Sequence, residues 1–176
     1  MGCARRSSPK SLLVYSARVN GASRRTMNAT QTDVAVQHVV LDTNAVLDWL
    51  VFGDAGMAAL AAAIERGCVG WIASPRMREE LRRTLSYPAL ARWVLDAPRT
   101  LTAFDRWAGL RGEPASLQFG PLMCSDPDDQ VFIDLALAHG ASWLVTHDRA
   151  LHKLGRRAAL AGVKIVRPRE WQSAAA

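Results

Sequence analysis

The sequence predicts an α/β layer fold with a parallel sheet, on three observations. From residue 38 onward, short apolar runs alternate with longer segments of helical pattern, the order from which parallel sheets are built. Two apolar runs lead directly into polar tripeptides that contain an aspartate, Asp42-Thr43-Asn44 and Thr146-His147-Asp148. The chain of 176 residues shows no internal repeat and suits one domain with a core of its own.

The predicted strands are short apolar runs of the kind that is buried in a sheet. They are expected at residues 38–41, 69–73, 142–146 and 163–166. The helix over 75–86 has Ser74 as its N-cap and Pro75 at its first position. Further helices are expected at 45–52, 56–66, 89–95, 98–108, 129–139 and 150–161, with a loop at 109–121 and a closing turn at 169–171.

The net charge of +6 comes entirely from the first 26 residues. That arm contains six basic residues and no acidic one, so the rest of the chain is neutral and is not a uniformly basic nucleic-acid binder. Residues 1–36 are rich in Ser, Arg, Thr, Asn and Ala and are predicted to be a disordered basic extension, with Met27 as the expected true start. Three scattered cysteines argue against a disulfide framework and favour a cytoplasmic location, and no apolar run is long enough for a membrane span.

Aspartates follow two of the predicted strands at the point where each strand ends. Asp42 comes directly after the first strand, and Asp148 closes the tripeptide that follows the strand at 142–146. In an open parallel sheet, ligands bind beyond the carboxyl ends of the strands, so the two carboxylates are expected to share a site. The alternative is that each aspartate only caps the helix after it. Asn44 and Thr146 add polar groups beside them.

The helix over 75–86 carries one acidic residue on its apolar side. Its apolar stripe at helical spacing consists of Met77, Leu81, Thr84 and Leu85. Glu80 lies within this stripe, and a carboxylate that points toward a core is costly unless it is paired or bound to a metal. Glu79 instead shares the solvated face with Arg82 and Arg83, where ion pairs are the ordinary explanation. We therefore predict a function for Glu80 and none for Glu79.

A third acidic group, Asp126-Pro127-Asp128-Asp129, precedes the apolar helix over 129–139. The helix dipole favours acids there by up to about 1 kcal/mol, which explains one or two of them. Three carboxylates this close together repel one another unless a cation intervenes. Asp134 lies ~140° around the helix from Asp129 and is expected to be solvated.

These candidate residues offer only oxygen ligands. Such ligands suit Mg²⁺ or Mn²⁺ rather than zinc, and the four histidines show no zinc-site spacing. The sequence contains no glycine-rich phosphate loop, nucleophile elbow or Cys-His pair. His147 is a weaker candidate for a general base, because a lone histidine beside an acid is more often a surface residue.

At these positions the sequence resembles the PIN-domain ribonucleases, and in particular the VapC-like toxin components of prokaryotic toxin–antitoxin pairs. The matching segments are residues 39–44, 74–85, 126–129, 132–138, 144–148 and 168–171. The resemblance implies a PIN domain over residues 37–173 with a three-layer α/β/α fold around a central parallel sheet. It leaves the basic extension outside the family pattern.

Carried over position by position, the acidic quartet of that family falls on Asp42, Glu80, Asp129 and Asp148. Asp126, Asn44 and Thr146 match supporting positions. The resemblance implies that Asp42, Asp129 and Asp148 hold Mg²⁺ or Mn²⁺ and that the protein cuts single-stranded RNA to leave a 5′-phosphate and a 3′-hydroxyl. Either Asp42 or Asp129 would act as the base toward water.

Arginines near the motifs are candidates for gripping substrate phosphates. They are Arg76, Arg78 and Arg149. The alternative is that they are solvated helix charges, which we prefer for Arg82. The resemblance also implies a small antitoxin that covers the acidic cleft, and a homodimer formed through the helices between Ala45 and Arg66, where Trp49, Leu50 and Phe52 would supply an apolar patch. Packing of these three inside the monomer is an equal alternative.

Two rival functions are weaker. A haloacid-dehalogenase-type phosphatase needs a second aspartate where this chain has Asn44, and its phosphate-binding lysine has no counterpart, because only Lys153 and Lys164 follow Lys10. A PIN fold that binds RNA or a protein without cutting is expected to lack an acid, and all four are present.

Overall fold

The computed structural model describes residues 36–114 and 122–171. The extension predicted for residues 1–36, except its last residue, and the expected start at Met27 lie outside the described residues. So do positions 115–121 of the predicted loop. Val36 is the first residue of the compact unit to which all described residues belong.

Five parallel strands form one sheet in the order β3-β2-β1-β4-β5. Their bounds are Gln37–Leu41 for β1, Val69–Ala73 for β2, Ala108–Leu110 for β3, Trp143–Val145 for β4 and Lys164–Val166 for β5. In the centre, Val39 is in register with Trp71 of β2 on one side and Trp143 of β4 on the other. The chain runs outward from β1 to β3 and then returns to β4 on the opposite side of β1. The carboxyl ends of β1 and β4 are therefore a topological switch point, where open α/β sheets bind ligands.

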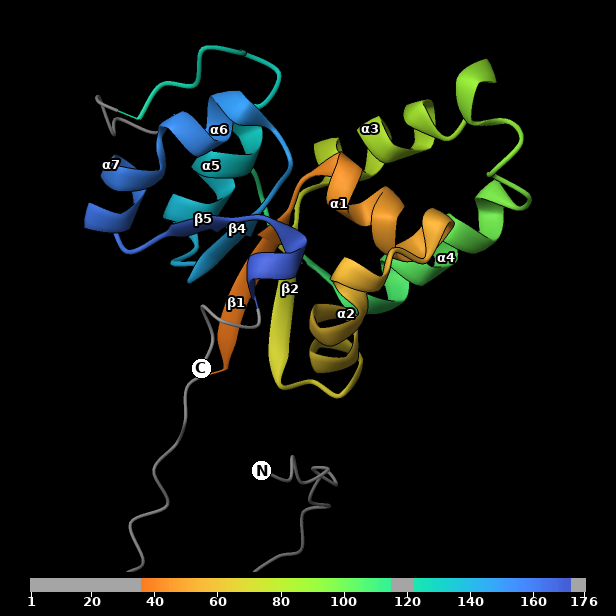
Figure 1. Ribbon diagram of the computed structural model, residues 1–176, viewed down its shortest axis with the longest axis horizontal. Coiled ribbons are helices and arrows are strands. Elements are labelled where there is room, and N and C mark those ends of the chain that lie inside the picture. The colour runs from red at the N-terminus through yellow and green to blue at the C-terminus, as the bar shows by residue number, and fades with distance from the viewer. Residues whose placement is uncertain (1–35, 115–121, 172–176) are drawn as a thin grey trace, which may run out of the picture. The chain divides into compact units, whose positions relative to one another are not determined.

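Helices cover both faces of this sheet, so the predicted three-layer α/β/α architecture is confirmed (Figure 1). One layer contains α1 (Thr43–Leu47), the π-helix η1 (Asp48–Phe52), the 3₁₀ turn η2 (Ala55–Met57), α2 (Ala58–Glu65), α3 (Pro75–Thr84), the 3₁₀ turn η3 (Pro88–Leu90) and α4 (Ala97–Trp107). The other contains α5 (Gln130–Ala138), α6 (Arg149–Lys153) and α7 (Gly155–Leu160), and the 3₁₀ turn η4 (Pro168–Glu170) follows β5.

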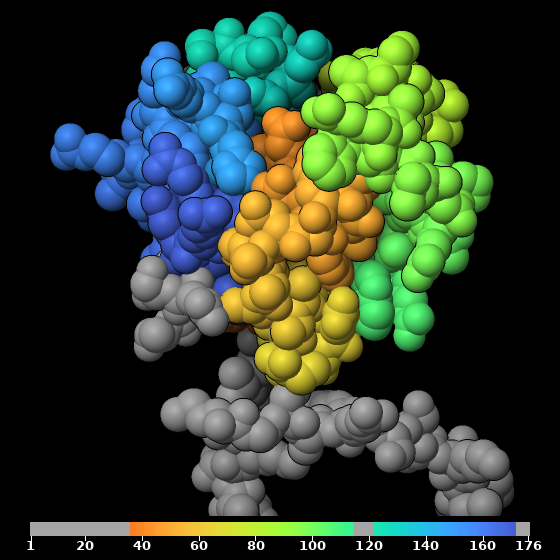
Figure 2. Space-filling model, turned by 45° about the vertical axis from the view of Figure 1, so that its right-hand side comes forward, coloured from red at the N-terminus to blue at the C-terminus, as the bar shows by residue number. Residues whose placement is uncertain are grey.

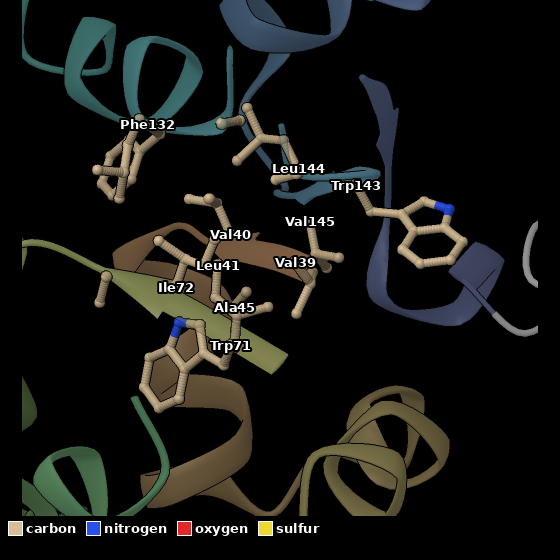
Figure 3. Close-up of a cluster of buried hydrophobic side chains, with 14 of the residues drawn as sticks. Val39, Val40, Leu41, Ala45, Trp71, Ile72, Phe132, Trp143, Leu144 and Val145 are labelled. Atoms are coloured by element: carbon tan, nitrogen blue, oxygen red, sulfur yellow. The ribbon is translucent and has the colours of Figure 1, made fainter. Parts of the chain in front are cut away.

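Apolar side chains fill the space between the layers. Val39, Val40 and Leu41 are fully buried, because the central strand is covered on both faces. Figure 3 shows Phe132 of α5 on one side of the sheet and Trp71 with Ala45 on the other. The Trp71 ring packs edge-on against Phe104 of α4 at 4.7 Å between centroids. Trp71 and Trp143 are core residues, as the sequence predicts.

Three elements differ from the sequence prediction. Ala108–Leu110 is an edge strand and not part of a loop, and within the described residues it pairs only with β2. The predicted helix over 89–95 is reduced to the turn η3. Trp93 and Leu95 are exposed, and in this segment only Leu90 and Val94 are partly buried against the core, which is too small a buried face to support a longer helix. The predicted helix over 150–161 is divided into α6 and α7 at Leu154, just before Gly155, a poor helix former.

No single helix in the described ranges is long and apolar enough to cross a membrane. Only the helical stretches 43–52 and 55–65 pass that test, as a pair bent by 108°.

Candidate active site

Asp42 is held at the carboxyl end of the central strand. Its side chain is only 3% exposed and caps α1 by accepting the Ala45 N–H at 2.6 Å on Oδ1. Its other oxygen accepts the Thr146 hydroxyl and the backbone N–H of His147, the latter at 3.3 Å. Burial raises the pKa of Asp42, and the hydrogen bonds from Thr146 and the backbone oppose that rise. The capping explanation is therefore correct for Asp42, and the same carboxylate also reaches the end of β4.

Thr146 joins the ends of β1 and β4. It is fully buried, and its hydroxyl donates to Asp42 while it accepts the backbone N–H of Asp148 at 2.8 Å. Asp148 in turn caps α6, since its Oδ1 accepts the N–H groups of Ala150 at 2.5 Å and Leu151 at 3.1 Å. One hydroxyl thus fixes two aspartates that lie far apart in the sequence.

Asp129 completes a cluster of carboxylates. It is half-buried at the start of α5 and makes no side-chain cap hydrogen bond to that helix. Burial, followed by the charges of Asp148, Asp126 and Asp42, raises the pKa of Asp129 to about 7. Asp126 is exposed, and its Oδ1 accepts the N–H of Asp128 at 3.0 Å. Like charges therefore converge here, as the repulsion argument predicts.

Glu80 approaches from α3. It is half-buried, and its Oε1 accepts the Thr43 hydroxyl at 2.6 Å, so it lies beside the residue that follows Asp42. Glu79 is on the solvated face, where both of its oxygens accept hydrogen bonds from Arg82 at 2.7 and 2.8 Å. Arg83 is 3.8 Å from Glu79. The predicted separation of Glu80 from the solvated Glu79 is confirmed.

The model of the PIN domain family matches residues 38–150, more than half of the chain. This chain belongs to the PIN-domain family. Among solved structures it is similar to VapBC2 from Rickettsia felis bound to a DNA fragment from their promoter, with a TM-score of 0.53, 16% identity, and coverage of 73% of this chain and 97% of that chain. At this identity the likeness shows the fold. No curated protein matches the sequence.

The supporting residues of this PIN domain differ in how closely they are held. Thr146 is fixed, as described, whereas Asn44 is exposed in the first turn of α1 and Asp126 is exposed before α5. Arg76 and Arg149 are also exposed, and neither has an ion-pair partner within the part of the chain that the structure describes. Arg78 is different, because Asp105 of α4 binds its guanidinium at 2.6 and 2.7 Å. Arg78 ties α3 to α4 and is not available to a phosphate, which corrects the prediction for this residue.

The sequence reasoning misses Asp48, which engages His147. Nε2 of His147 lies 2.6 Å from Oδ2 of Asp48 in the π-helix η1, and only the backbone N–H of His147 reaches Asp42. Asp48 and His147 are 99 positions apart in the chain, so no local sequence pattern predicts that they meet. The proposed base role of His147 is therefore weakened, because its ring is engaged by another carboxylate.

The sequence reasoning also misses Gln130, which fixes the segment that precedes the acids. Its Nε2 donates to the Leu122 carbonyl at 3.1 Å, and its Oε1 accepts the Cys124 N–H at 2.7 Å. The same Nε2 donates to Asp134 at 2.7 Å. Asp134 is thus half-buried and hydrogen-bonded, which corrects the expectation that it is solvated. The spacing of Gln130 and Asp134 on one helix is a signal that was available in the sequence.

The donor set of the PIN domain fits a hard divalent cation. The converging groups are all carboxylates, the ligands that such cations prefer, and burial together with the neighbouring charges raises the pKa of Asp129. Across the described ranges, no group of three His, Cys, Asp or Glu side chains is already arranged so that it could hold a metal ion. Both oxygens of Asp42 and one of Asp148 accept protein hydrogen bonds, which fix these carboxylates without using all of their lone pairs, about four per carboxylate.

Proposed function

We propose that this PIN domain is a Mg²⁺- or Mn²⁺-dependent endoribonuclease that cleaves single-stranded RNA. The observation that carries the proposal is the convergence of Asp42, Asp129 and Asp148, with Asp126 beside them. Burial, and then the charges of these neighbours, raise the pKa of Asp129 to about 7. Glu80 faces the same region through its hydrogen bond with Thr43. PIN domains are generally nucleases, and the family match over residues 38–150 includes all four acids of the proposed quartet.

The carboxylates of the site have different roles. Asp42 is held by three hydrogen bonds and provides a fixed anchor. Asp129 makes no cap hydrogen bond to its helix, so we assign to this less restrained carboxylate the role of base toward the attacking water. A divalent cation, when bound, neutralises the carboxylates and stabilises the leaving oxygen. Hydrolysis leaves a 5′-phosphate and a 3′-hydroxyl.

We further propose that the protein is the toxin of a type II toxin–antitoxin pair and acts in the cytoplasm. The support is its structural similarity to VapBC2 of Rickettsia felis. A small antitoxin with a basic side chain would suit the acidic cleft, because the carboxylates repel one another.

A homodimer is part of this proposal, although its predicted surface is smaller than the sequence suggests. Trp49 and Leu50 pack against the core, with Trp49 5.6 Å from the Trp71 ring. Phe52 is 40% exposed and contacts Trp93, whose ring centroid lies 5.7 Å away. Only Phe52 of the three therefore remains as a surface contact.

A PIN fold that binds RNA or a protein without cutting is the second candidate. The observation in its favour is that no closed metal site is found among the residues the structure describes. Membership of the PIN family sets aside the phosphatase alternative.

The test is cleavage of a labelled single-stranded RNA with Mg²⁺ or Mn²⁺, and with EDTA. Cleavage is expected with either metal and should stop in EDTA. Glu80→Gln should lower kcat/KM by roughly 100-fold or more, whereas the matched change Glu79→Gln should have almost no effect because Glu79 faces solvent. Robust cleavage in EDTA, or equal damage by the two substitutions, contradicts the mechanism. RNA binding without cleavage favours the second candidate.

A further inference from the structure

A polar groove lies directly beside the acidic cluster, between α3 and the segment that leads into α5. Its volume is about 350 Å³, within the range of roughly 300–1,000 Å³ that small-ligand sites occupy. Its lining residues are Arg76, Glu80, Arg83, Thr84, Tyr87 and Asp128. Figure 2 shows α1 at the bottom of a notch between the α3 side and the segment that begins at residue 122.

The lining residues from α3 form one stripe along the helix. Arg76, Glu80 and Arg83 follow one another at intervals of four and three residues, which places them on one face of α3, and Tyr87 lines the groove from the segment just beyond the end of α3. Met77 and Leu81, which are buried, occupy the adjacent face. The helix thus buries one side and presents a polar side with two guanidinium groups about two turns apart.

Both arginines of this stripe are available to an anion. Arg76 has no ion-pair partner within the described ranges. Arg83 reaches Glu79 only at 3.8 Å, and the Glu79 carboxylate is already bound by Arg82 through two hydrogen bonds. Guanidinium groups bind phosphate oxygens with matching planar geometry.

Tyr87 stands at the end of the groove and is 55% exposed. Its ring makes no aromatic contact within the described part of the protein. Exposed aromatic rings beside cationic groups are the usual platform for single-stranded nucleic acids, because each unpaired base offers a face for stacking. A duplex keeps its bases stacked and offers no such face.

We propose that this groove is a binding site for single-stranded RNA, in which Tyr87 stacks on an unpaired base while Arg76 and Arg83 bind flanking phosphates. The inference rests on the proposed function and names the residues that select the substrate. Glu80 lines the groove and also contacts Thr43, so a strand bound there passes directly into the acidic cluster. The exposed carboxylate of Asp128 lines the same groove and repels the phosphates of a bound RNA strand.

The test is fluorescence anisotropy with a labelled single-stranded RNA and with a duplex of the same length. It is carried out with Mg²⁺ in an Asp129→Asn background, so that the RNA is not consumed. Tyr87→Ala should weaken single-strand binding about 5- to 100-fold, Tyr87→Phe should restore it, and neither should change duplex binding. The double change Arg76→Ala and Arg83→Ala should reduce the slope of log K against log salt by about 1.4, or ~0.7 for each lost phosphate contact.

Two controls fix the interpretation. Arg157→Ala removes an exposed arginine from α7, in the other helical layer, and should change nothing. Asp128→Asn should tighten binding, because it removes a negative charge from the groove. In cleavage assays with Asp129 intact, the single change Tyr87→Ala should raise KM and leave kcat nearly unchanged.

The groove proposal is overturned if Tyr87→Ala and the double arginine variant bind like the parent protein, if the duplex is affected equally, or if no RNA binds at all. Failure of the proposed function looks different: the wild type does not cleave, while these variants still lose single-strand binding. If the wild type cleaves RNA and the variants bind RNA as tightly as the parent protein does, the groove proposal is wrong and the proposed function stands.

Discussion

Removal of the Asp129 carboxylate, one of the proposed catalytic groups, should stabilise the metal-free protein. We expect Asp129→Asn to raise the free energy of unfolding, measured at pH 8 in EDTA. The same change should abolish the cleavage that is measured with metal. The pKa of Asp129 is about 7 in the folded protein, compared with an ordinary value of 3.8. A carboxyl whose folded pKa is raised favours the fold when protonated. The ionised form therefore costs stability, increasingly as the pH rises from about 4 to 7 and constantly above that.

The magnitude follows from the size of this shift. A change of about three pH units corresponds to an upper limit of ~4 kcal/mol, since one unit is about 1.4 kcal/mol. Asp129 is only half-buried, so solvent screening reduces that figure, and we expect ~1–2 kcal/mol. For a domain of this size the melting temperature should rise by about 3–8 °C.

The assay is thermal unfolding followed by circular dichroism in EDTA at pH 8 and pH 5. The difference between Asp129→Asn and wild type should be large at pH 8 and smaller at pH 5. Asp128→Asn is the matched control: its carboxylate is exposed, and its effect should stay within about 0.5 kcal/mol. Added Mg²⁺ should stabilise the wild type more than Asp129→Asn. A variant that is no more stable than wild type at pH 8, or whose gain is the same at both pH values, would refute the reasoning.

Two further predictions concern the acidic segment and the cell. Gln130→Ala should lower the free energy of unfolding in urea by ~2–3 kcal/mol, because it leaves the Leu122 carbonyl and the Cys124 N–H without their partner. Asp134→Asn keeps an acceptor for Gln130 and should cost less. Equal losses in the two variants would show that the bonds to Leu122 and Cys124 are not decisive. Expression of the wild type without an antitoxin should slow growth of a bacterial host, whereas Asp42→Asn at the same expression level should not; if both are harmless, the toxin role fails even where cleavage survives.

Much of the architecture is readable from local pattern. The bounds of β2 agree with the apolar run at 69–73, and α3 begins after its N-cap Ser74, which accepts the Met77 N–H at 3.3 Å. Glu80 falls on the inner side of that helix as its spacing predicts. Such features depend on which face of an element is buried, and the sequence carries that information within a few residues.

The edge strand and the minor helices are less readable. β3 has only three residues, pairs on one side alone and contains Gly109, so its extended form comes from the neighbouring β2 rather than from its own propensity. The predicted helix at 89–95 is wrong for a different reason: only Leu90 and Val94 of this segment pack against the core, and so small a buried face does not stabilise a helix of that length.

By itself, the sequence determined the α/β class, the order of the elements, the core and the identity of the candidate acids. Only the tertiary structure decided which partners they meet. Thr146 donates a hydrogen bond to Asp42, 104 positions away in the sequence, and Thr43 donates one to Glu80, 37 positions away. Arg78 instead forms an ion pair with Asp105. The first of these pairings depends on the return of the chain from β3 to β4 beside β1, and the other two depend on the packing of α3 against α1 and α4. Local periodicity specifies which face of a helix or strand is buried, but contacts between distant residues exist only once the crossovers have placed the strand ends side by side.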